Sequence, residues 1–396
     1  MKRIYLDYAS LTPTDSRVIC EMKKYYSVKY SNPSSLYKEG VAAKKVLAEG
    51  RQKVADYINS HSDEIIFTSG GTEANNLAIE GIIRAAVRSG VKTPHIVISS
   101  IEHSSIVEVV NKLEISGCEG IKCEVTRLSV DKDGVISLDE LKKSIKSNTI
   151  LVSIMMVNNE IGSVQPIRDI AKIVRRSKIT NYPLLHTDAA QALYEEINMD
   201  NLEVDLLTLD GGKVYGPRGI GALYIKRELM ENKLIEPIIL GGGQEFGLRS
   251  GTENVSGIMG FAKALELITK ERDFSQLKIS EFRKVFIEGL KKIRPNIAIN
   301  GNLNSGESQG VKIPQSPHIL NVSIPSIDNE FLLFQLDANG IACSTKSSCL
   351  RDEEESYVLK SIGADSKTSL RFSFGRFTKM GDIKKSLRVI TKLLTA

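Results

Sequence analysis

Strand-like and helix-like runs alternate along the chain from about residue 15 to residue 260, and this alternation limits the folds it can adopt. Apolar, β-prone runs occupy residues 65–67, 95–99, 149–157, 184–186, 205–209 and 222–225. Between them, apolar residues recur at helical spacing, as in residues 73–87, 104–114 and 167–176. The pattern predicts an α/β fold in which helices flank a mainly parallel sheet, with ligands bound at the carboxyl ends of the strands.

The last third of the chain follows a different pattern. Its runs are a helical stretch from about residue 255 to 272, a loop rich in Gly, Ser, Asn and Pro at 300–317, strands at 318–324 and 369–374, and a final helix at 381–394. We therefore predict a large domain of residues 15–260, with residues 1–14 and 261–396 forming a smaller α+β domain.

Composition argues against several classes of protein. The 396 residues carry a formal net charge of +5, and their Lys and Arg residues are spread out, so no basic patch predicts nucleic-acid binding. No apolar run approaches the roughly 20 residues of a membrane span. Five cysteines without regular spacing predict no disulfide framework and favour a reducing cytoplasm. Cys118 and Cys123 have no second pair nearby, so we predict no metal site.

A lysine on a glycine-rich turn is the first candidate for chemistry. Lys213 lies in Asp-Gly-Gly-Lys-Val-Tyr-Gly-Pro-Arg-Gly at residues 210–219, between two β-prone runs. Glycines on both sides of a lysine allow a cofactor to approach closely, and such a lysine can condense with an aldehyde. Taken alone, the pattern is weak, because most lysines between strands are solvated surface charges.

Three further segments at predicted strand ends complete a candidate site for pyridoxal 5'-phosphate (PLP). Residues 67–76 run from a strand into a helix, so the Thr72 hydroxyl and free amides suit a phosphate. Asp188 ends an apolar strand and can pair with a protonated pyridine nitrogen, although a helix N-cap is the commoner role of such an aspartate. The amides around Asn159 can donate to the phenolic oxygen of the ring, or be ordinary turn residues.

The ordered set of motifs resembles the cysteine desulfurases of the class V aminotransferase group. The resemblance extends over residues 5–394, and it adds Tyr-Leu-Asp-Tyr at 5–8, Ser-Asn-Pro-Ser at 31–34, Glu-His at 102–103, Arg-Ser-Gly-Thr at 249–252 and Leu-Arg-Phe-Ser-Phe-Gly-Arg-Phe at 370–377. It implies a fold-type I PLP-dependent transferase. The implied reaction converts L-cysteine to L-alanine and leaves a persulfide on the enzyme.

The resemblance implies roles for individual residues. Cys349, in Ser-Ser-Cys on a polar loop, is similar to the sulfur-carrying cysteine of the long-loop group I enzymes, with Lys346 placed to lower its pKa, whereas Cys343 is expected to be a buried small hydrophobe. The other expected site residues are Lys213 and His103 for catalysis, Gly71, Thr72, His103, Asn159, Asp188, Gln191, Lys213 and Thr252 for the cofactor, and Asn32 and Arg371 for the substrate.

The resemblance also implies partners. Thr252 is similar to a residue that reaches the cofactor of the second subunit, which predicts a homodimer with shared active sites. The persulfide would pass to an acceptor protein, either an iron–sulfur scaffold or a tRNA-thiolation enzyme. Many relatives dock the scaffold through a C-terminal tail beyond the last helix expected here, which leaves the choice of acceptor open.

One segment departs from the family pattern. Asp210-Gly-Gly-Lys213 stands where the family usually has Ser-Gly-His-Lys, so a hydroxyl and an imidazole that face the phosphate are missing. We expect Asp210 to turn away from the phosphate or to bind a cation. We expect Gly212 to have a positive φ or to bring its backbone unusually close to the phosphate, which would compensate for the lost side chains.

Two other functions compete with this interpretation. The chain could be a selenocysteine lyase or another class V lyase or aminotransferase, or a non-catalytic binding protein that has drifted at Asp210 and Gly212. The second alternative is disfavoured because the remaining expected catalytic set is intact, namely Lys213, Asp188, His103, Arg371 and Cys349.

Overall fold

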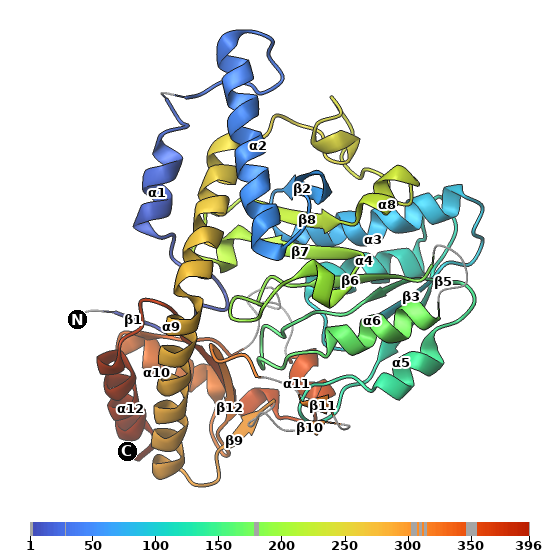
Figure 1. Ribbon diagram of the computed structural model, residues 1–396. Helices are drawn as coiled ribbons and strands as arrows, with labels where there is room; N and C mark the ends of the chain where they lie inside the picture. The colour runs from blue at the N-terminus through green and yellow to red at the C-terminus, as the bar shows by residue number, and fades with distance from the viewer. Residues whose placement is uncertain are drawn as a thin grey trace.

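The computed structural model describes residues 3–27, 29–177, 182–301, 307–308, 311–312, 315–345 and 355–395. Its centre is a seven-stranded sheet in the order β2-β8-β7-β6-β5-β3-β4 (Figure 1). The strands are β2 (Ile65–Thr68), β3 (His95–Ser99), β4 (Glu124–Leu128), β5 (Thr149–Ser153), β6 (Leu184–Asp188), β7 (Leu206–Asp210) and β8 (Gly221–Ile225). Of these, β8 runs antiparallel to both of its neighbours and the other pairs are parallel, so the predicted α/β fold with a mainly parallel sheet is confirmed.

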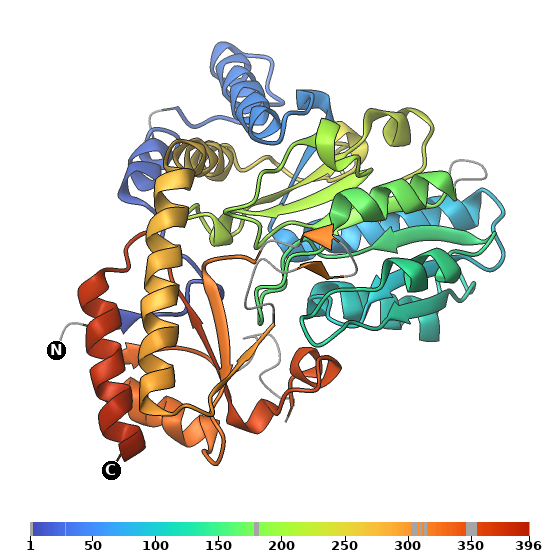
Figure 2. The ribbon, with the colours of Figure 1, turned by 60° about the horizontal axis from the view of Figure 1, so that its bottom comes forward.

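Helices cover both faces of this sheet (Figure 2). One face packs against α3 (Gly71–Arg88) and α4 (Ser104–Ile115), and the other against α6 (Ile167–Arg176) and α2 (Lys38–Ile58). Side chains alternate between the two cores along a strand, as a pleated strand requires: Ile65 and Phe67 belong to one core and Ile66 to the other. The remaining helices of this part are α1 (Ser16–Lys23), α5 (Leu138–Ser144), α7 (Met199–Leu202) and α8 (Arg227–Glu231).

Helix α9 (Val255–Ile293) is 39 residues long and continues well past the predicted end near residue 272. Its second half stays helical because it buries a stripe at helical spacing, formed by Ser275, Ile279, Phe282, Phe286 and Leu290. The helix packs against α1 and α2 at one end and against α12 (Met380–Thr395) at the other (Figure 1).

The C-terminal part is an antiparallel sheet backed by helices. Strand β12 (Ile319–Ser323) pairs with both β14 (Ser369–Ser373) and β9 (Ala298–Asn300), and α10 (Asn329–Ala338) contacts β14. The N-terminus joins this part, because β1 (Ile4–Tyr5) pairs in parallel with β13 (Ile341–Ala342). The remaining elements are the hairpin of β10 (Glu307–Ser308) and β11 (Val311–Lys312), and α11 (Tyr357–Ser361). The residue limits predicted for the two domains stay a prediction.

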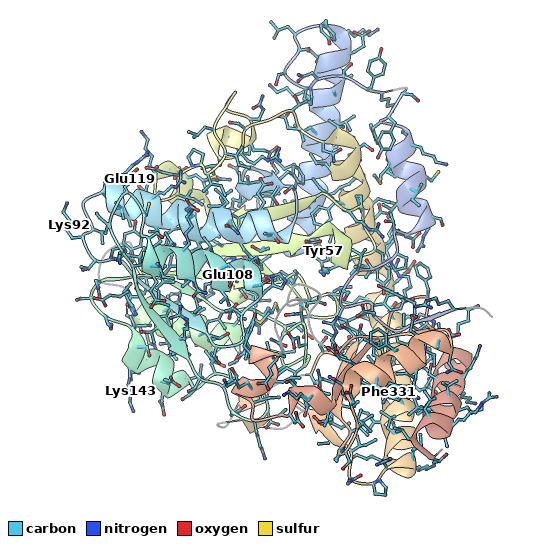
Figure 3. All side chains as sticks on the ribbon, turned by 180° about the vertical axis from the view of Figure 1, so that it is seen from behind. Tyr57, Lys92, Glu108, Glu119, Lys143 and Phe331 are labelled. Carbon is cyan, nitrogen blue, oxygen red and sulfur yellow. The ribbon has the colours of Figure 1, made fainter. Side chains whose placement is uncertain are left out.

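Charged side chains of both signs project from the surface of the larger part, among them Lys92, Glu119 and Lys143 (Figure 3). Within the described ranges, no helix combines the length and apolar character needed to cross a membrane. In the same part of the chain, no three His, Cys, Asp or Glu side chains gather as metal ligands would.

Candidate active site

A cavity of about 180 Å³ opens at the carboxyl ends of the parallel strands. Strands β6 and β7 end in Asp188 and Asp210 at its wall, and the helices α3 and α4 begin there. Predicted site residues from distant parts of the sequence line this cavity, namely Gly71, Thr72, His103, Asn159, Asp188, Gln191, Lys213 and Arg371. The strand-end location expected for an α/β sheet is therefore where the structure brings these residues together.

Lys213 ends the short 3-10 helix that follows β7. Its Nζ donates to the carbonyl oxygens of Ser10 (2.5 Å) and Ala9 (3.2 Å), which hold the amine at the cavity wall. The turn needs glycine at Gly211, because a Cβ there would lie 2.8 Å from the Pro217 carbonyl oxygen. The chain is thus bent tightly enough to direct the lysine into the cavity.

Asp188 is buried, with a relative exposure of 6%, and its carboxylate is fixed by two hydrogen bonds. Oδ2 accepts from Asn75 Nδ2 (2.8 Å), and Oδ1 accepts from the amide of Ala190 (2.9 Å). The residue caps a turn rather than a helix. A buried and oriented carboxylate of this kind is placed to pair with a cation inside the cavity.

Asn75 is a site residue that the sequence reasoning missed. It lies three residues after Thr72 on α3, a spacing that puts both side chains on the same helix face, which could have identified it. Its Nδ2 also donates to Ser105 Oγ (2.8 Å), while its buried Oδ1 has no hydrogen-bond partner among the described residues. Asn75 therefore links Asp188 to the start of α4.

His103 is the N-cap of α4, and its ring lines the cavity. The Ser105 amide donates to Nδ1 (3.2 Å), and the Ser105 hydroxyl lies 2.8 Å from the same nitrogen. Since Nδ1 accepts, the neutral ring carries its proton on Nε2. A chain of hydrogen bonds thus extends from Asp188 through Asn75 and Ser105 to the imidazole.

Arg371, on β14, is almost completely buried at the junction of the two parts. One guanidinium NH2 group, Nη1, donates to the Asn159 carbonyl oxygen (2.8 Å), and the other, Nη2, donates to Asp7 Oδ1 and Ser10 Oγ (2.9 Å each). Its Nε has no partner among the described residues. Asp7 and Ser10 were missed as site residues, although Asp7 belongs to the Tyr-Leu-Asp-Tyr motif that carried the resemblance.

Gln191 lines the cavity and is hydrogen-bonded to both the N-terminal segment and the C-terminal part of the chain. Its Nε2 donates to the Ala9 carbonyl oxygen (2.8 Å), and its Oε1 lies 3.2 Å from Nε2 of His318. Burial lowers the pKa of His318 to about 3, so this histidine is neutral and donates its Nε2 proton to Gln191.

Two predicted residues do not line the cavity. Asn32 is exposed, and its Oδ1 accepts from the Ser34 amide (2.9 Å) within a turn. Thr252 is exposed on the loop before α9.

Cys349 and Lys346 lie outside the described residues. The segments on both sides of them are anchored beside the cavity: Ser344 forms two backbone hydrogen bonds with Arg371, and the Ser356 hydroxyl donates to Glu160 (2.6 Å).

The structure contradicts two of the expectations for this segment, that the Asp210 carboxylate turns away and that Gly212 has a positive φ. A cation at Asp210 and a close approach of the Gly212 backbone to the phosphate stay predictions. Asp210 lines the cavity instead of turning away, because its carboxylate accepts hydrogen bonds from the amides of Gly71 (2.9 Å) and Gly212 (2.7 Å). Gly212 is not among the glycines with positive φ. A Cβ on Gly212 would lie 3.1 Å from Asp210 Oδ1 and 3.2 Å from Leu11 Cδ1, so local crowding favours a glycine there.

Glu102 precedes His103 and is fully buried behind the cavity. It accepts hydrogen bonds from the Ser99 hydroxyl and the Met155 amide, but burial outweighs them and raises the pKa of its carboxyl to about 8. An unfolded glutamate titrates near 4.5, so the folded state holds this proton more tightly between pH 4.5 and 8. The resulting stabilisation is complete below pH 4.5 and is lost as the pH rises through 8.

We therefore expect the parent to lose stability relative to Glu102→Gln as the pH rises from 5 to 8. The difference should change by up to about 1.4 kcal/mol per pH unit, which urea denaturation at several pH values will measure. The buried His186 and His318 titrate in both proteins, so their contributions cancel in the difference. A difference independent of pH would show that Glu102 is ionised in the folded protein.

Comparisons with known proteins agree with this geometry. The family model for aminotransferase class-V matches residues 4–385. The chain is 38% identical to the cysteine desulfurase IscS of Dictyoglomus turgidum, covering 100% of this chain and 95% of the relative. It is 39% identical to the mitosomal cysteine desulfurase of Trachipleistophora hominis, covering 98% and 85%.

Comparison with solved structures also finds proteins of this kind. A NifS-like protein superposes with a TM-score of 0.88 at 32% identity, covering 99% of both chains. A structure described as SspA in complex with cysteine superposes with a TM-score of 0.76 at 32% identity, covering 95% of this chain and 100% of that one. The chain belongs to the class-V aminotransferase family of PLP-dependent enzymes, and among its members to the cysteine desulfurases.

Proposed function

We propose that the protein removes the sulfur of L-cysteine, releases L-alanine and carries the sulfur as a persulfide on Cys349. The observation that carries this proposal is the convergence of Lys213, Asp188, His103 and Arg371 on one cavity from four separate segments. A primary amine, a buried carboxylate, an imidazole and a guanidinium together supply the groups that such a reaction on an amino acid requires.

These residues fit PLP. Lys213 offers an amine for the aldehyde, and Asp188, fixed by Asn75, offers a carboxylate for the pyridine nitrogen. Thr72 and the first turn of α3 lie at the same cavity and suit the phosphate. When bound, the cofactor supplies an electron sink that stabilises negative charge at the substrate carbon.

The substrate would be held and deprotonated by residues of this chain. Arg371 presents a guanidinium whose Nε has no partner among the described residues, and this buried donor suits the substrate carboxylate. Once released from the Ser10 carbonyl, the amine of Lys213 can accept the α-proton of the substrate. His103, whose Nδ1 accepts from the Ser105 amide, also lines the cavity and can hold or pass a proton there.

Sulfur transfer is assigned to Cys349. Its thiolate attacks the substrate sulfur, an S–S bond forms, and the C–S bond breaks with its electron pair remaining on the carbon that is later protonated to give L-alanine. Ser344 and Ser356 lie on either side of the cysteine in sequence; Ser344 binds Arg371, which lines the cavity, and Ser356 binds Glu160, the neighbour of the cavity residue Asn159. The chain between them is long enough to bring a thiol to the substrate.

We expect Cys349→Ser to lower sulfide release from L-cysteine by at least about 100-fold and to hold no persulfide. Cofactor trapped on Lys213 by borohydride should be unchanged in this variant. Cys343→Ser is the matched control, because burial raises the pKa of the Cys343 thiol to about 12 and keeps it protonated near neutral pH. Full activity in Cys349→Ser, with loss in Cys343→Ser, would move the sulfur-carrying role to Cys343.

We further infer a homodimer in the cytoplasm that passes its sulfur to an acceptor protein, an iron–sulfur scaffold or a tRNA-thiolation enzyme. Exposed Thr252 supports the dimer, because it lies outside the cavity of its own chain and is free to reach a second one. Exposed Leu240 and Phe246 on the preceding loop offer apolar area for such an interface. Sedimentation of the Leu240→Ser variant against the parent tests it.

A further inference from the structure

The N-terminus of α3 already binds an anion, and that anion is a side chain of this protein. The first-turn amides of an 18-residue helix have no partners inside the helix and lie at the positive end of its dipole. The amide of Gly71 donates to Asp210 Oδ2 (2.9 Å), while Asp210 Oδ1 accepts from the Gly212 amide (2.7 Å). The carboxylate thus occupies the Gly71 amide at the cavity wall, one of the donors that suit a phosphate.

We propose that Asp210 is a built-in competitor of the cofactor phosphate. The phosphate must displace this carboxylate from the Gly71 amide or bind beside it. In both cases the phosphate contributes less to the affinity for PLP than it would without the carboxylate. The proposal rests on the assignment of the cofactor to Lys213. It predicts a protein whose cofactor is held mainly by its covalent link and its ring, and which therefore exchanges PLP readily.

The surrounding charges support this inference. Glu73, in the first turn of α3, is a second carboxylate at the same helix end, where it accepts from the Ser69 amide (2.8 Å). The cation next to it, Arg249, donates to Glu73 (2.9 Å) and thus neutralises that carboxylate. Asp210, by contrast, is held by two backbone amides, so its charge faces an incoming dianion.

Gly212 is part of the same arrangement as Asp210, because its amide donates to the Asp210 carboxylate. A Cβ on Gly212 would lie 3.1 Å from Asp210 Oδ1, a contact tighter than side chains normally make. While Asp210 binds the Gly212 amide, a histidine at position 212 is therefore crowded. Asp210 and Gly212, which both differ from the family motif, therefore depend on each other, because the carboxylate at position 210 favours glycine at position 212.

Affinities for PLP and for pyridoxal, which lacks the phosphate, separate the phosphate contribution from that of the ring. Equilibrium dialysis, with borohydride trapping on Lys213, should be performed on the parent, Asp210→Ser and Asp210→Asn. We expect both variants to bind PLP on the order of 10- to 100-fold more tightly than the parent, because a repulsive charge is removed. Their affinity for pyridoxal should not change.

Asp365→Ser is the matched control. Asp365 also caps a three-residue 3-10 helix and accepts from the amide two residues ahead, but it is exposed and does not line the cavity. Its replacement should alter neither affinity. Gly212→His should weaken PLP binding in the parent and strengthen it in the Asp210→Ser background, as expected if the carboxylate requires the glycine.

Three results would overturn the proposal. An unchanged ratio of PLP to pyridoxal affinity in both Asp210 variants would reduce Asp210 to a turn cap. PLP binding by the parent that requires added Mg²⁺ and is lost with a chelator would mean that Asp210 attracts the phosphate through a cation. Failure of both ligands to be trapped on Lys213 in any protein would remove the cofactor assignment itself, and the proposal with it.

Discussion

Replacing Lys213 with alanine is expected to abolish covalently held PLP and to lower alanine formation by roughly 10⁴-fold. The amine has two tasks, binding the aldehyde and moving the α-proton, so its removal affects both. The structure holds Nζ at the cavity wall through the carbonyls of Ser10 and Ala9, which keeps the lysine aligned. Absorbance in the near-visible and peptide mapping after borohydride reduction measure the covalent link.

Lys213→Arg is the control for this variant. Arginine keeps a cation that can donate to the same carbonyl oxygens, but it cannot condense with an aldehyde under these conditions. It should therefore fold as the parent does, while being as inactive as the alanine variant. Reducible cofactor that persists in Lys213→Ala would assign the covalent link to another lysine.

Replacing Arg371 with leucine is expected to abolish turnover and also to destabilise the fold. Arg371 is 1% exposed, and its removal leaves Asp7 without its cation and the Asn159 carbonyl without its donor. Breaking a buried pair costs about 3–5 kcal/mol, and the 18% exposure of the Asp7 side chain places the expected loss near the lower end of that range. Urea denaturation measures this loss, and the dependence of turnover on cysteine concentration measures the loss of the clamp.

A second substitution separates the two effects of Arg371. Asp7→Asn in the Arg371→Leu background removes the uncompensated charge and should restore part of the stability. Turnover should stay low, because the substrate carboxylate still lacks its partner. If activity returned together with stability, Arg371 would be a structural residue and the clamp would lie elsewhere.

The sequence was sufficient to predict elements whose signal is local. The buried strands β3, β5, β6 and β7 each contain a short apolar run, and Asp188 and Lys213 could be recognised because they follow the runs of β6 and β7. Strand β4 was missed because it lies at the edge of the sheet, where most of its side chains are only partly buried or exposed and the apolar run that identifies a buried strand is absent.

Contacts between residues distant in sequence could not be found in this way. The helical spacing from Thr72 could have placed Asn75 at the site, but its hydrogen bond to Asp188, like that of Arg371 to Asp7, joins residues far apart in the sequence. Asp210 was recognised as unusual, but its direction depends on the Gly71 amide, which only the fold brings close. The extra length of α9 likewise depends on the small sheet that its second half covers.

The pairing of β1 with β13 has a consequence for how the protein is made. Residues from the first ten positions hold Lys213 through the carbonyls of Ala9 and Ser10, and Asp7 holds Arg371, near the other end of the chain. On a ribosome, the N-terminal segment must wait for almost the entire chain to emerge before its partners exist. Such long-range closure is slow, so we expect the cavity to be completed, and PLP to be bound, only after the C-terminal strands are available for pairing.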